Sequence, residues 1–269
     1  AQVLSAWPQP PRTRGVRILL TNDDGVHARG LEVLERIART LSDDVTIVAP
    51  LEEQSGKGRS LSLTEPVRLR RFGERRFAVT GTPTDAVMMA LAEIMKDSPP
   101  DLILSGVNRG ANLGEDVSYS GTVSAAMEGA LAGIRSIALS QRYAAPSPGE
   151  RVSFDAAEQW GERVLRPLID ADWAPRTLMN VNFPPVPAAE VKGIRAVSQG
   201  LRDYGRMKLD KRTDPRGFDY YWFGLGRIEH TPVADTDLEA IEMGYITVTP
   251  LHLDMTHRES LDMVTDIFR

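Results

Sequence analysis

Cysteine is absent from the 269 residues of this chain, which excludes disulfide bonds within it and any thiolate chemistry. No apolar run approaches the roughly 20 residues of a membrane-spanning helix, so we expect no membrane partner. The first fifteen residues also lack the apolar stretch of a signal peptide. Together these absences predict a cytoplasmic protein.

Net positive charge is lacking too, because 37 acidic residues outnumber 32 basic ones and leave a net charge of −5. This balance gives no electrostatic basis for nucleic-acid binding, although a bound cation would still allow an anionic small substrate. The four histidines have no metal-binding spacing. The Gly-x-Gly-x-x-Gly pattern of dinucleotide binding is missing after the first expected strand. Ser120 lacks the preceding Gly-x of a nucleophile elbow, which counts against a serine hydrolase.

Between Val16 and Ser140 the sequence alternates short β-prone runs with amphipathic segments, which is typical of a mainly parallel sheet with helices on both faces. We therefore predict an α/β fold that is Rossmann-like, with three layers in the order α/β/α. The expected strands cover residues 16–20, 45–49 (ended by Pro50), 67–72, 75–80, 101–105, 137–140, 178–183, 194–198 and 245–249. The expected helices cover residues 31–41, 82–94, 122–133, 154–168 and a last stretch from 256, and a glycine-rich loop is expected over 106–121.

Particular residues predict where two of the helices begin and where a hairpin lies. Thr82 is expected to cap a helix, and Thr256 with Glu259 has the spacing of a capping box for the last helix. Aromatic residues gather between 218 and 223. A hairpin there either packs on the core or is offered to a partner subunit.

The strongest indication of chemistry is the first strand, which runs directly into Asp23, Asp24 and Gly25. Two adjacent carboxylates repel each other, and a divalent cation such as Mg²⁺ or Mn²⁺ offsets that repulsion while preferring hard oxygen ligands. Ligands of open α/β sheets bind at the carboxyl ends of the strands. The alternative is that these aspartates only cap the following helix.

Two further strand ends carry polar residues suited to the same site. The hydroxyl of Ser55 and the amide oxygen of Asn108 are suitable ligands for a hard cation, although Ser55 alternatively satisfies a turn and Asn108 a left-handed one. Gly121 and Thr122 open a helix of small residues, which offers backbone N–H groups to a phosphate, and a hydroxyl of Ser120 or Thr122 adds a donor. The combination predicts metal-assisted phosphoryl transfer to water.

With these residues in place, the sequence resembles the SurE family of survival proteins, which are metal-dependent 5′-nucleotidases. The resemblance runs from Val16 almost to the end of the chain, and the motifs keep their order. The matching segments are 16–25, 48–50 with 54–56, 81–85, 105–114, 119–129, 236–237 and 244–251. One departure is Arg29, where the family usually has proline.

The resemblance implies a role for each candidate residue. It implies that one Mg²⁺ or Mn²⁺ is held by the metal ligands Asp23, Asp24, Ser55 and Asn108. It implies that Asp23 and Asp24 are catalytic and that the phosphate is bound by Asn108, Ser120, Gly121 and Thr122. It also implies broad base tolerance, and homodimers or homotetramers that exchange carboxyl-terminal elements.

We therefore expect a divalent-metal-dependent phosphomonoester hydrolase that acts on nucleoside monophosphates and releases inorganic phosphate. A metal-activated water is expected to attack phosphorus, and direct attack by an aspartate stays open. Its main activity is expected to be that of a 5′-nucleotidase, with 3′-nucleotides and polyphosphate as further candidate substrates. The alternative is a non-catalytic nucleotide-binding or assembly module.

The chain is expected to divide into three parts. Residues 1–15 form a flexible extension, and residues 16–142 form the Rossmann-like core that binds metal and phosphate. Residues 143–269 complete that core and, with a hairpin and a helix, form the oligomer contacts. Two prolines and a glycine within 143–150 mark the boundary.

Overall fold

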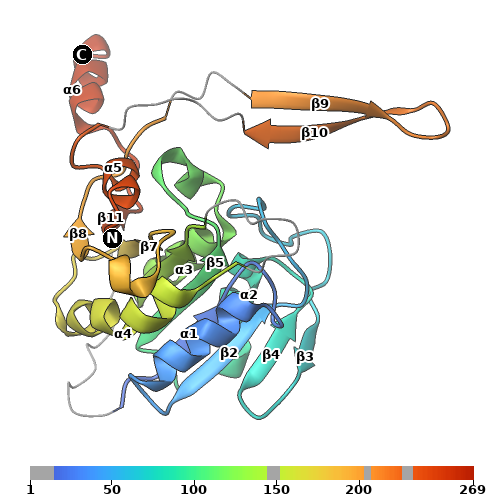
Figure 1. Cartoon of the computed structure of the whole chain (residues 1–269), viewed down its shortest axis with the longest axis vertical. Coiled ribbons are helices and arrows are strands. Elements are labelled where there is room, and N and C mark those ends of the chain that lie inside the picture. Colours follow the sequence, from blue (N-terminus) through green and yellow to red (C-terminus); the bar gives the residue numbers. More distant parts are fainter. Residues whose placement is uncertain (1–14, 144–151, 203–206, 226–232) are drawn as a thin grey trace.

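The computed structural model describes residues 15–143, 152–202, 207–225 and 233–269 (Figure 1). These residues build one large sheet with the strand order β3-β4-β2-β1-β5-β6-β7-β11-β8. Its strands are β1 (Ile18–Thr21), β2 (Val45–Pro50), β3 (Leu69–Arg71), β4 (Arg76–Val79), β5 (Leu102–Arg109), β6 (Arg135–Gln141), β7 (Thr177–Phe183), β8 (Ile194–Ala196) and β11 (Ile246–His252). The run from β4 to β7 is parallel, whereas β3 and β11 lie antiparallel to β4 and β7.

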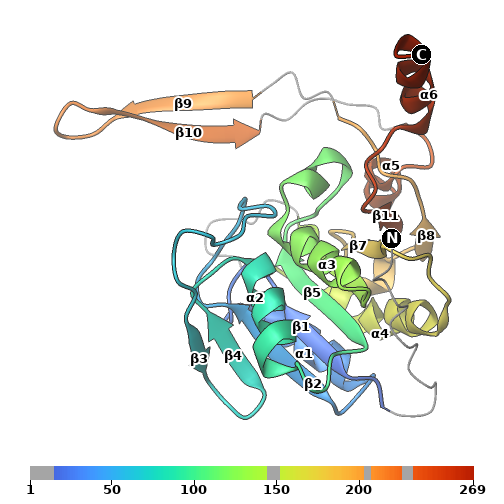
Figure 2. The same ribbon diagram turned by 180° about the vertical axis from the view of Figure 1, so that it is seen from behind.

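Helices cover both faces of this sheet and complete a three-layer α/β/α arrangement. Figure 1 shows α1 (Arg29–Arg39) and α4 (Asp155–Asp170) on one face. Figure 2 shows α2 (Pro83–Met89) and α3 (Gly121–Leu131) on the other, with α2 continued by a π-helical turn, η1 (Ala90–Ile94). The predicted Rossmann-like α/β fold is therefore confirmed.

Alternation along β1 shows why the sheet needs both helical layers. Ile18 and Leu20 pack into the core beneath α1 and α4, whereas Leu19 between them packs into the core beneath α2 and α3. All three side chains are fully buried. Because successive strand residues point to opposite faces, an all-apolar strand of this kind is stable only where both faces are covered.

The predicted cap at Thr82 is confirmed, since its side chain accepts from the backbone of Asp85 while the Asp85 side chain accepts from the backbone of Thr82. The cap predicted for the last helix, α6 (Arg258–Ile267), is wrong. His257 occupies the N-cap position instead of Thr256, and its ring nitrogen Nδ1 accepts from the backbone N–H of Ser260 at 3.3 Å.

The glycine-rich loop predicted over 106–121 is also corrected. Strand β5 continues to Arg109 after an irregularity between Ser105 and Asn108. Gly106 makes this path possible, because its φ is +137° and a Cβ there would lie 2.2 Å from the Leu139 carbonyl oxygen. The segment then forms a 3₁₀ turn, η2 (Gly114–Ser118), before α3 begins.

Smaller differences concern strand ends and the parts outside the described residues. Pro50 is the last residue of β2, one position beyond the predicted range 45–49, because it still pairs with Val79 of β4. The predicted extension over 1–15 lies outside the described residues except for residue 15, and so does most of the predicted boundary over 143–150.

The predicted aromatic hairpin is present and consists of β9 (Met207–Thr213) and β10 (Asp219–Leu225). It does not join the large sheet, and Figure 1 shows it extending away from the body of the molecule. We call residues 207–225 the arm. A short helix, α5 (Asp237–Glu242), lies between the arm and β11 in the sequence. No helix in the described ranges is long and apolar enough to cross a membrane.

Candidate active site

The loop that follows β1 places Asp23 and Asp24 at the carboxyl edge of the sheet. Strand β1 lies between β2 and β5, so the loops after all three strands meet around it. The Asp23 carbonyl oxygen accepts from the backbone N–H of Gln54 at 2.8 Å, which joins the loop after β1 to the loop after β2. The amide of Asn22 donates to the Gly25 carbonyl oxygen at 2.9 Å and closes the turn.

Asp23 is almost completely buried, with 4% of its surface exposed. Burial raises the pKa of its carboxyl group from 3.8 to about 6; the hydrogen bond from Thr122 opposes this rise and the charge of Asp24 adds to it. The Thr122 hydroxyl donates to Oδ1 of Asp23 at 2.5 Å. A Cβ on Gly121 would lie 2.8 Å from the Asp23 Cβ, so the first turn of α3 packs directly against this carboxylate.

Asp24 is held from the opposite side by the end of β5. Its Oδ2 accepts from the backbone N–H of Arg109 at 3.1 Å. Burial raises the pKa of Asp24, while the hydrogen bond and the charge of Arg109 oppose the rise. The two adjacent carboxylates are therefore poorly solvated and carry negative charge that their protein contacts only partly offset.

Ser55 lies on the loop after β2, as predicted, whereas Asn108 lies within β5, which continues to Arg109, and not in the loop predicted after residue 105. The Ser55 hydroxyl donates to Oε1 of Glu53 at 2.9 Å, and the Asn108 amide donates to the Gly110 carbonyl oxygen at 3.0 Å. Glu53 also forms an ion pair with Arg109 at 3.7 Å, which links the two loops beside Asp24. The structure thus gathers the four predicted ligands at one edge of the sheet.

The donor set fits a hard divalent cation. No group of three or more His, Cys, Asp or Glu side chains gathers in the described part of the chain to hold a metal. A cation beside Asp23 and Asp24 would therefore complete its shell with neutral oxygens, from Ser55, Asn108 and water. Few carboxylates together with neutral oxygens and water are the ligands that Mg²⁺ and Mn²⁺ accept.

The start of α3 faces this carboxylate pair and resembles an anion-binding site. Ser120 is the N-cap residue, and its hydroxyl oxygen accepts from Val123 N–H at 3.0 Å. The backbone N–H groups of Gly121 and Thr122 belong to the first helical turn, which has no intrahelical acceptor for them. The Thr122 hydroxyl, predicted as a possible phosphate donor, donates to Asp23 instead.

Comparison with known proteins gives the family of the chain. The family model described as "Survival protein SurE" matches residues 18–206 of the chain. The chain belongs to the SurE family. A protein of Rhizorhabdus wittichii named 5′-nucleotidase SurE is 69% identical over 254 residues, covering 94% of this chain and 100% of that relative. Another of the same name, from Erythrobacter litoralis, is 61% identical and covers 94% of this chain and 100% of its own.

A solved structure gives the same result for the fold. The crystal structure of SurE from Aquifex aeolicus superimposes with a TM-score of 0.81 at 36% identity. The match covers 94% of this chain and 100% of that one. The SurE fold therefore extends over almost the whole molecule, including the carboxyl-terminal part.

Asp237 is a residue of this SurE site whose role the sequence analysis missed. Its side chain is fully buried, and it accepts from Gly114 N–H at 2.9 Å and from Gly200 N–H at 2.8 Å. Burial raises its pKa, against the opposing effect of these backbone hydrogen bonds. It anchors the turn η2, which leads directly into Ser120. Residues 236–237 match a family segment, but Thr-Asp before an apolar run indicates by itself only a helix cap, so this long-range contact was not predicted.

Buried amides hold the segment just before that turn. Asn112 N–H donates to Oδ1 of Asn182 at 2.8 Å, and the Asn112 side chain donates to the Ser140 hydroxyl at 2.7 Å. The Asn112 carbonyl oxygen accepts from the amide of Asn180 at 2.8 Å. Strands β6 and β7 thus hold the segment that leads to the turn η2 through buried side-chain hydrogen bonds.

Asp23→Asn should stabilise the metal-free protein at pH 8. Because the folded pKa of about 6 lies above 3.8, the folded protein binds this proton more tightly than the unfolded chain. The free energy of unfolding therefore falls as the pH rises from 3.8 to about 6 and stays low above that value. The difference between the folded and unfolded pKa values corresponds to roughly 3 kcal/mol of unfolding free energy. We therefore expect the unfolding free energy of the neutral variant to be about 1–3 kcal/mol higher in urea denaturation with chelator present.

The gain should disappear below about pH 4, where Asp23 is protonated in both states. Asp43→Asn is the matched control, because Asp43 is exposed and lies in the loop before β2; its stability should stay within about 0.5 kcal/mol of wild type. A variant Asp23→Asn that is less stable at pH 8, or equally stabilised at every pH, would contradict the burial of an uncompensated charge.

Proposed function

We propose that this chain is a divalent-metal-dependent phosphomonoester hydrolase that acts on nucleoside 5′-monophosphates. The observation that carries the proposal is the adjacent pair of Asp23, which is buried against the amino-terminal turn of α3, and Asp24, which is partly buried. The names of the two relatives, both 5′-nucleotidase SurE, support the substrate class.

Each element of the site has a role in this reaction. Asp23, Asp24, Ser55 and Asn108 would hold the cation, which supplies charge neutralisation for the phosphate and lowers the pKa of a water molecule when it is bound. The N–H groups of Gly121 and Thr122 would bind the equatorial phosphate oxygens, where negative charge is concentrated during transfer. These donors are fixed before substrate arrives, so they need no reorganisation during the reaction.

Thr122 links the two halves of the site. Its backbone N–H belongs to the first turn of α3 and also acts on the Asp23 carboxylate, to which its hydroxyl donates. The hydrogen bond fixes the rotamer of Asp23 and orients its second oxygen, Oδ2, toward Gly121. Thr122 would thereby fix the position of the cation relative to that of the phosphate.

Phosphate release should depend on both metal and Asp23. We expect hydrolysis of nucleoside 5′-monophosphates that stops with EDTA and returns with Mg²⁺ or Mn²⁺. Asp23→Asn should lower kcat/KM by at least about 100-fold, because a ligand of the cation and its charge are lost together. Colorimetric phosphate release from a panel that includes 3′-nucleotides and polyphosphate measures the effect and ranks the substrates.

Asp43→Asn again serves as the control and should keep wild-type turnover. Circular dichroism on each variant shows that the fold is intact. If folded wild-type protein released no phosphate with any metal, the chain would be better described as a nucleotide-binding or assembly module. If Asp23→Asn turned over normally, its assignment to the site would be wrong.

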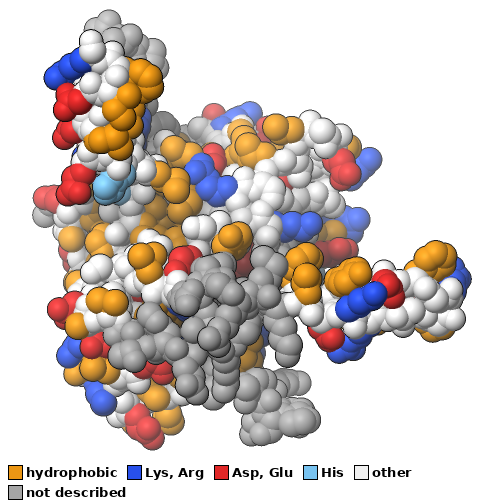
Figure 3. All heavy atoms as spheres, turned by 90° about the horizontal axis from the view of Figure 1, so that it is seen from above, with side chains coloured by type: hydrophobic (Ala, Val, Ile, Leu, Met, Phe, Trp, Pro, Cys, Tyr) orange, Lys and Arg blue, Asp and Glu red, His pale blue; other side chains and the backbone are white. Residues whose placement is uncertain are grey.

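We further propose that the protein self-associates through the arm and α6. Aromatic side chains on the arm are largely exposed, including Phe218 (70%), Trp222 (61%) and Phe223 (76%). Figure 3 shows hydrophobic side chains along the arm where it extends away from the body. Helix α6 contains no buried residue and exposes Ile267 together with other apolar side chains. Such surface is stable in water when it packs against a second copy.

Light scattering coupled to size-exclusion chromatography tests this assembly. Wild type should have about two or four times the 29.7 kDa mass of one chain. A double variant, Trp222→Ser with Phe223→Ser, should shift toward the single-chain mass because the arm loses its apolar contacts. Leu131→Ser, which changes an exposed apolar residue of α3 outside the arm, should not. A wild-type protein with the mass of one chain at micromolar concentration would contradict the proposal.

A further inference from the structure

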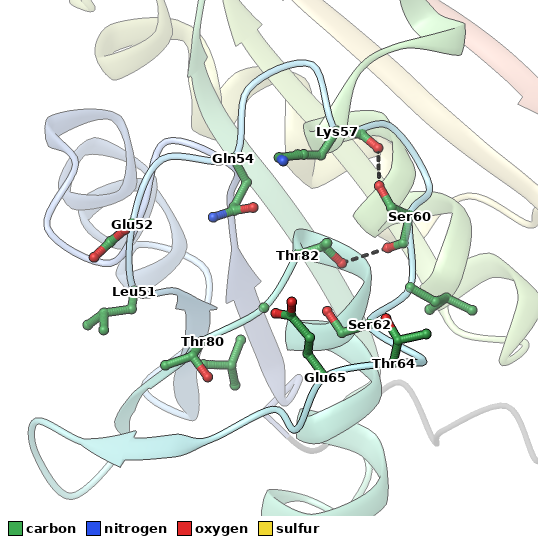
Figure 4. A pocket seen from close by; sticks show the side chains of 13 residues that line it. Leu51, Glu52, Gln54, Lys57, Ser60, Ser62, Thr64, Glu65, Thr80 and Thr82 are labelled. Atoms are coloured by element: carbon green, nitrogen blue, oxygen red, sulfur yellow. Dashed lines mark hydrogen bonds between the residues drawn. The ribbon is translucent and has the colours of Figure 1, made fainter.

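A cavity of about 430 Å³ lies at the carboxyl ends of β2 and β4, beside the candidate active site (Figure 4). Its walls include Gln54, Lys57, Ser62, Glu65 and Thr82. The volume falls within the range of small-molecule sites in proteins. None of Asp23, Asp24 or the residues of α3 lines it, so the phosphate-binding turn does not account for it.

The cavity and the acidic pair share one loop. Gln54 lines the cavity with its side chain, while its backbone N–H donates to the Asp23 carbonyl oxygen at 2.8 Å. Ser55, a candidate metal ligand, is the next residue. On the far side of the same loop, a Cβ on Gly58 would lie 3.7 Å from the Ser118 carbonyl oxygen, close to the start of α3. The loop that lines the cavity thus contacts both Asp23 and the turn before α3.

Hydrogen bonds hold the wall of the cavity in place. The Thr82 hydroxyl donates to the Ser60 carbonyl oxygen at 2.8 Å, and the Ser62 hydroxyl donates to Oδ2 of Asp85 at 2.7 Å (Figure 4 shows the first of these). Burial alone would raise the pKa of Asp85, but hydrogen bonds from Thr82 and Ser62 outweigh it and hold the pKa below its ordinary value. The loop is thereby tied to the start of α2, so the cavity is preformed.

The side chains that line the cavity favour the sugar over the base and the phosphate of a nucleotide. The described residues around the cavity include no aromatic ring on which a base would stack. They include two carboxylates, Glu52 and Glu65, against the single ammonium of Lys57, which disfavours a second phosphate. Amide, hydroxyl and carboxylate groups instead match a ring with several hydroxyls, each of which both donates and accepts.

We propose that this cavity binds the sugar of the leaving nucleoside, with the Gln54 amide and the Glu65 carboxylate contacting its hydroxyls. The inference rests on the proposed function, because the phosphate must lie at α3 for the sugar to reach the cavity. Carboxylates bind vicinal sugar hydroxyls in the same manner at dinucleotide sites. The base then stays outside the cavity, where its identity matters little.

Three substrates test which part of the nucleotide binds in the cavity. Adenosine 5′-monophosphate has sugar and base, ribose 5-phosphate has the sugar alone, and phenyl phosphate has neither. Gln54→Ala and Glu65→Gln should each lower kcat/KM about five- to tenfold for the first two substrates, mostly through KM, because each removes hydrogen bonds to the sugar. The value for phenyl phosphate should change less than twofold. Glu74→Gln, at an exposed position in the β3–β4 turn, is the matched control.

The other outcomes overturn the assignment in different ways. Equal losses for all three substrates would mean that these residues shape the phosphate site, and no loss for any would mean that the cavity is not used. A loss for the nucleotide without a loss for ribose 5-phosphate would place the base in the cavity. If the wild type hydrolysed none of the three with metal present, the proposed function itself would fail, together with the inference that rests on it.

Discussion

The structure of this site depends on keeping two adjacent carboxylates, Asp23 and Asp24, at a buried edge of the sheet. Like charges this close repel, and burial removes the water that would screen them. The cost is visible in their pKa values, which are both raised above the ordinary range. In the function that we propose, a bound divalent cation would offset this repulsion and attract a phosphate.

The surrounding elements are arranged to hold this pair in position. Gly121 lets the first turn of α3 approach within contact of Asp23, and Thr122 orients its carboxylate. On the other side the end of β5 donates its backbone N–H to Asp24. Asp237 anchors the turn before α3 from a distant part of the sequence. Precise placement of the site thus comes from strand ends and helix starts, which are among the most rigid parts of an α/β fold.

Local periodicity was enough to predict the strands of the large sheet, the helices other than α5, and the edge of the sheet where the site lies. The predicted cap at Thr82 is confirmed for the same reason, since capping is decided within one turn. The path of the chain at Gly106 was not predictable, because it depends on how closely the backbone approaches Leu139 in the neighbouring strand. The contact of Asp237 with Gly114 spans 123 positions and leaves no local pattern. The prediction of a loop over 106–121 was wrong because contacts with residues far away in the sequence determine the path of the backbone there.

The arm and the cavity beside the candidate site differ in how they are attached to the rest of the molecule. The arm is a hairpin outside the large sheet, so its aromatic residues have little of the body to pack against. The cavity, in contrast, is part of the body and is tied by its loop to Asp23. The proposed phosphate and sugar sites are thus joined by one loop, whereas the arm, which we propose for self-association, lies outside the large sheet.

Binding of Mn²⁺, followed by its electron paramagnetic resonance signal in the absence of substrate, tests the central claim most directly. The account predicts saturable binding of one ion per chain, with affinity at least about tenfold weaker in Asp24→Asn because one charged ligand is lost. Asp43→Asn should bind like wild type. Absence of saturable binding by the folded protein, or equal affinity in Asp24→Asn, would contradict the account.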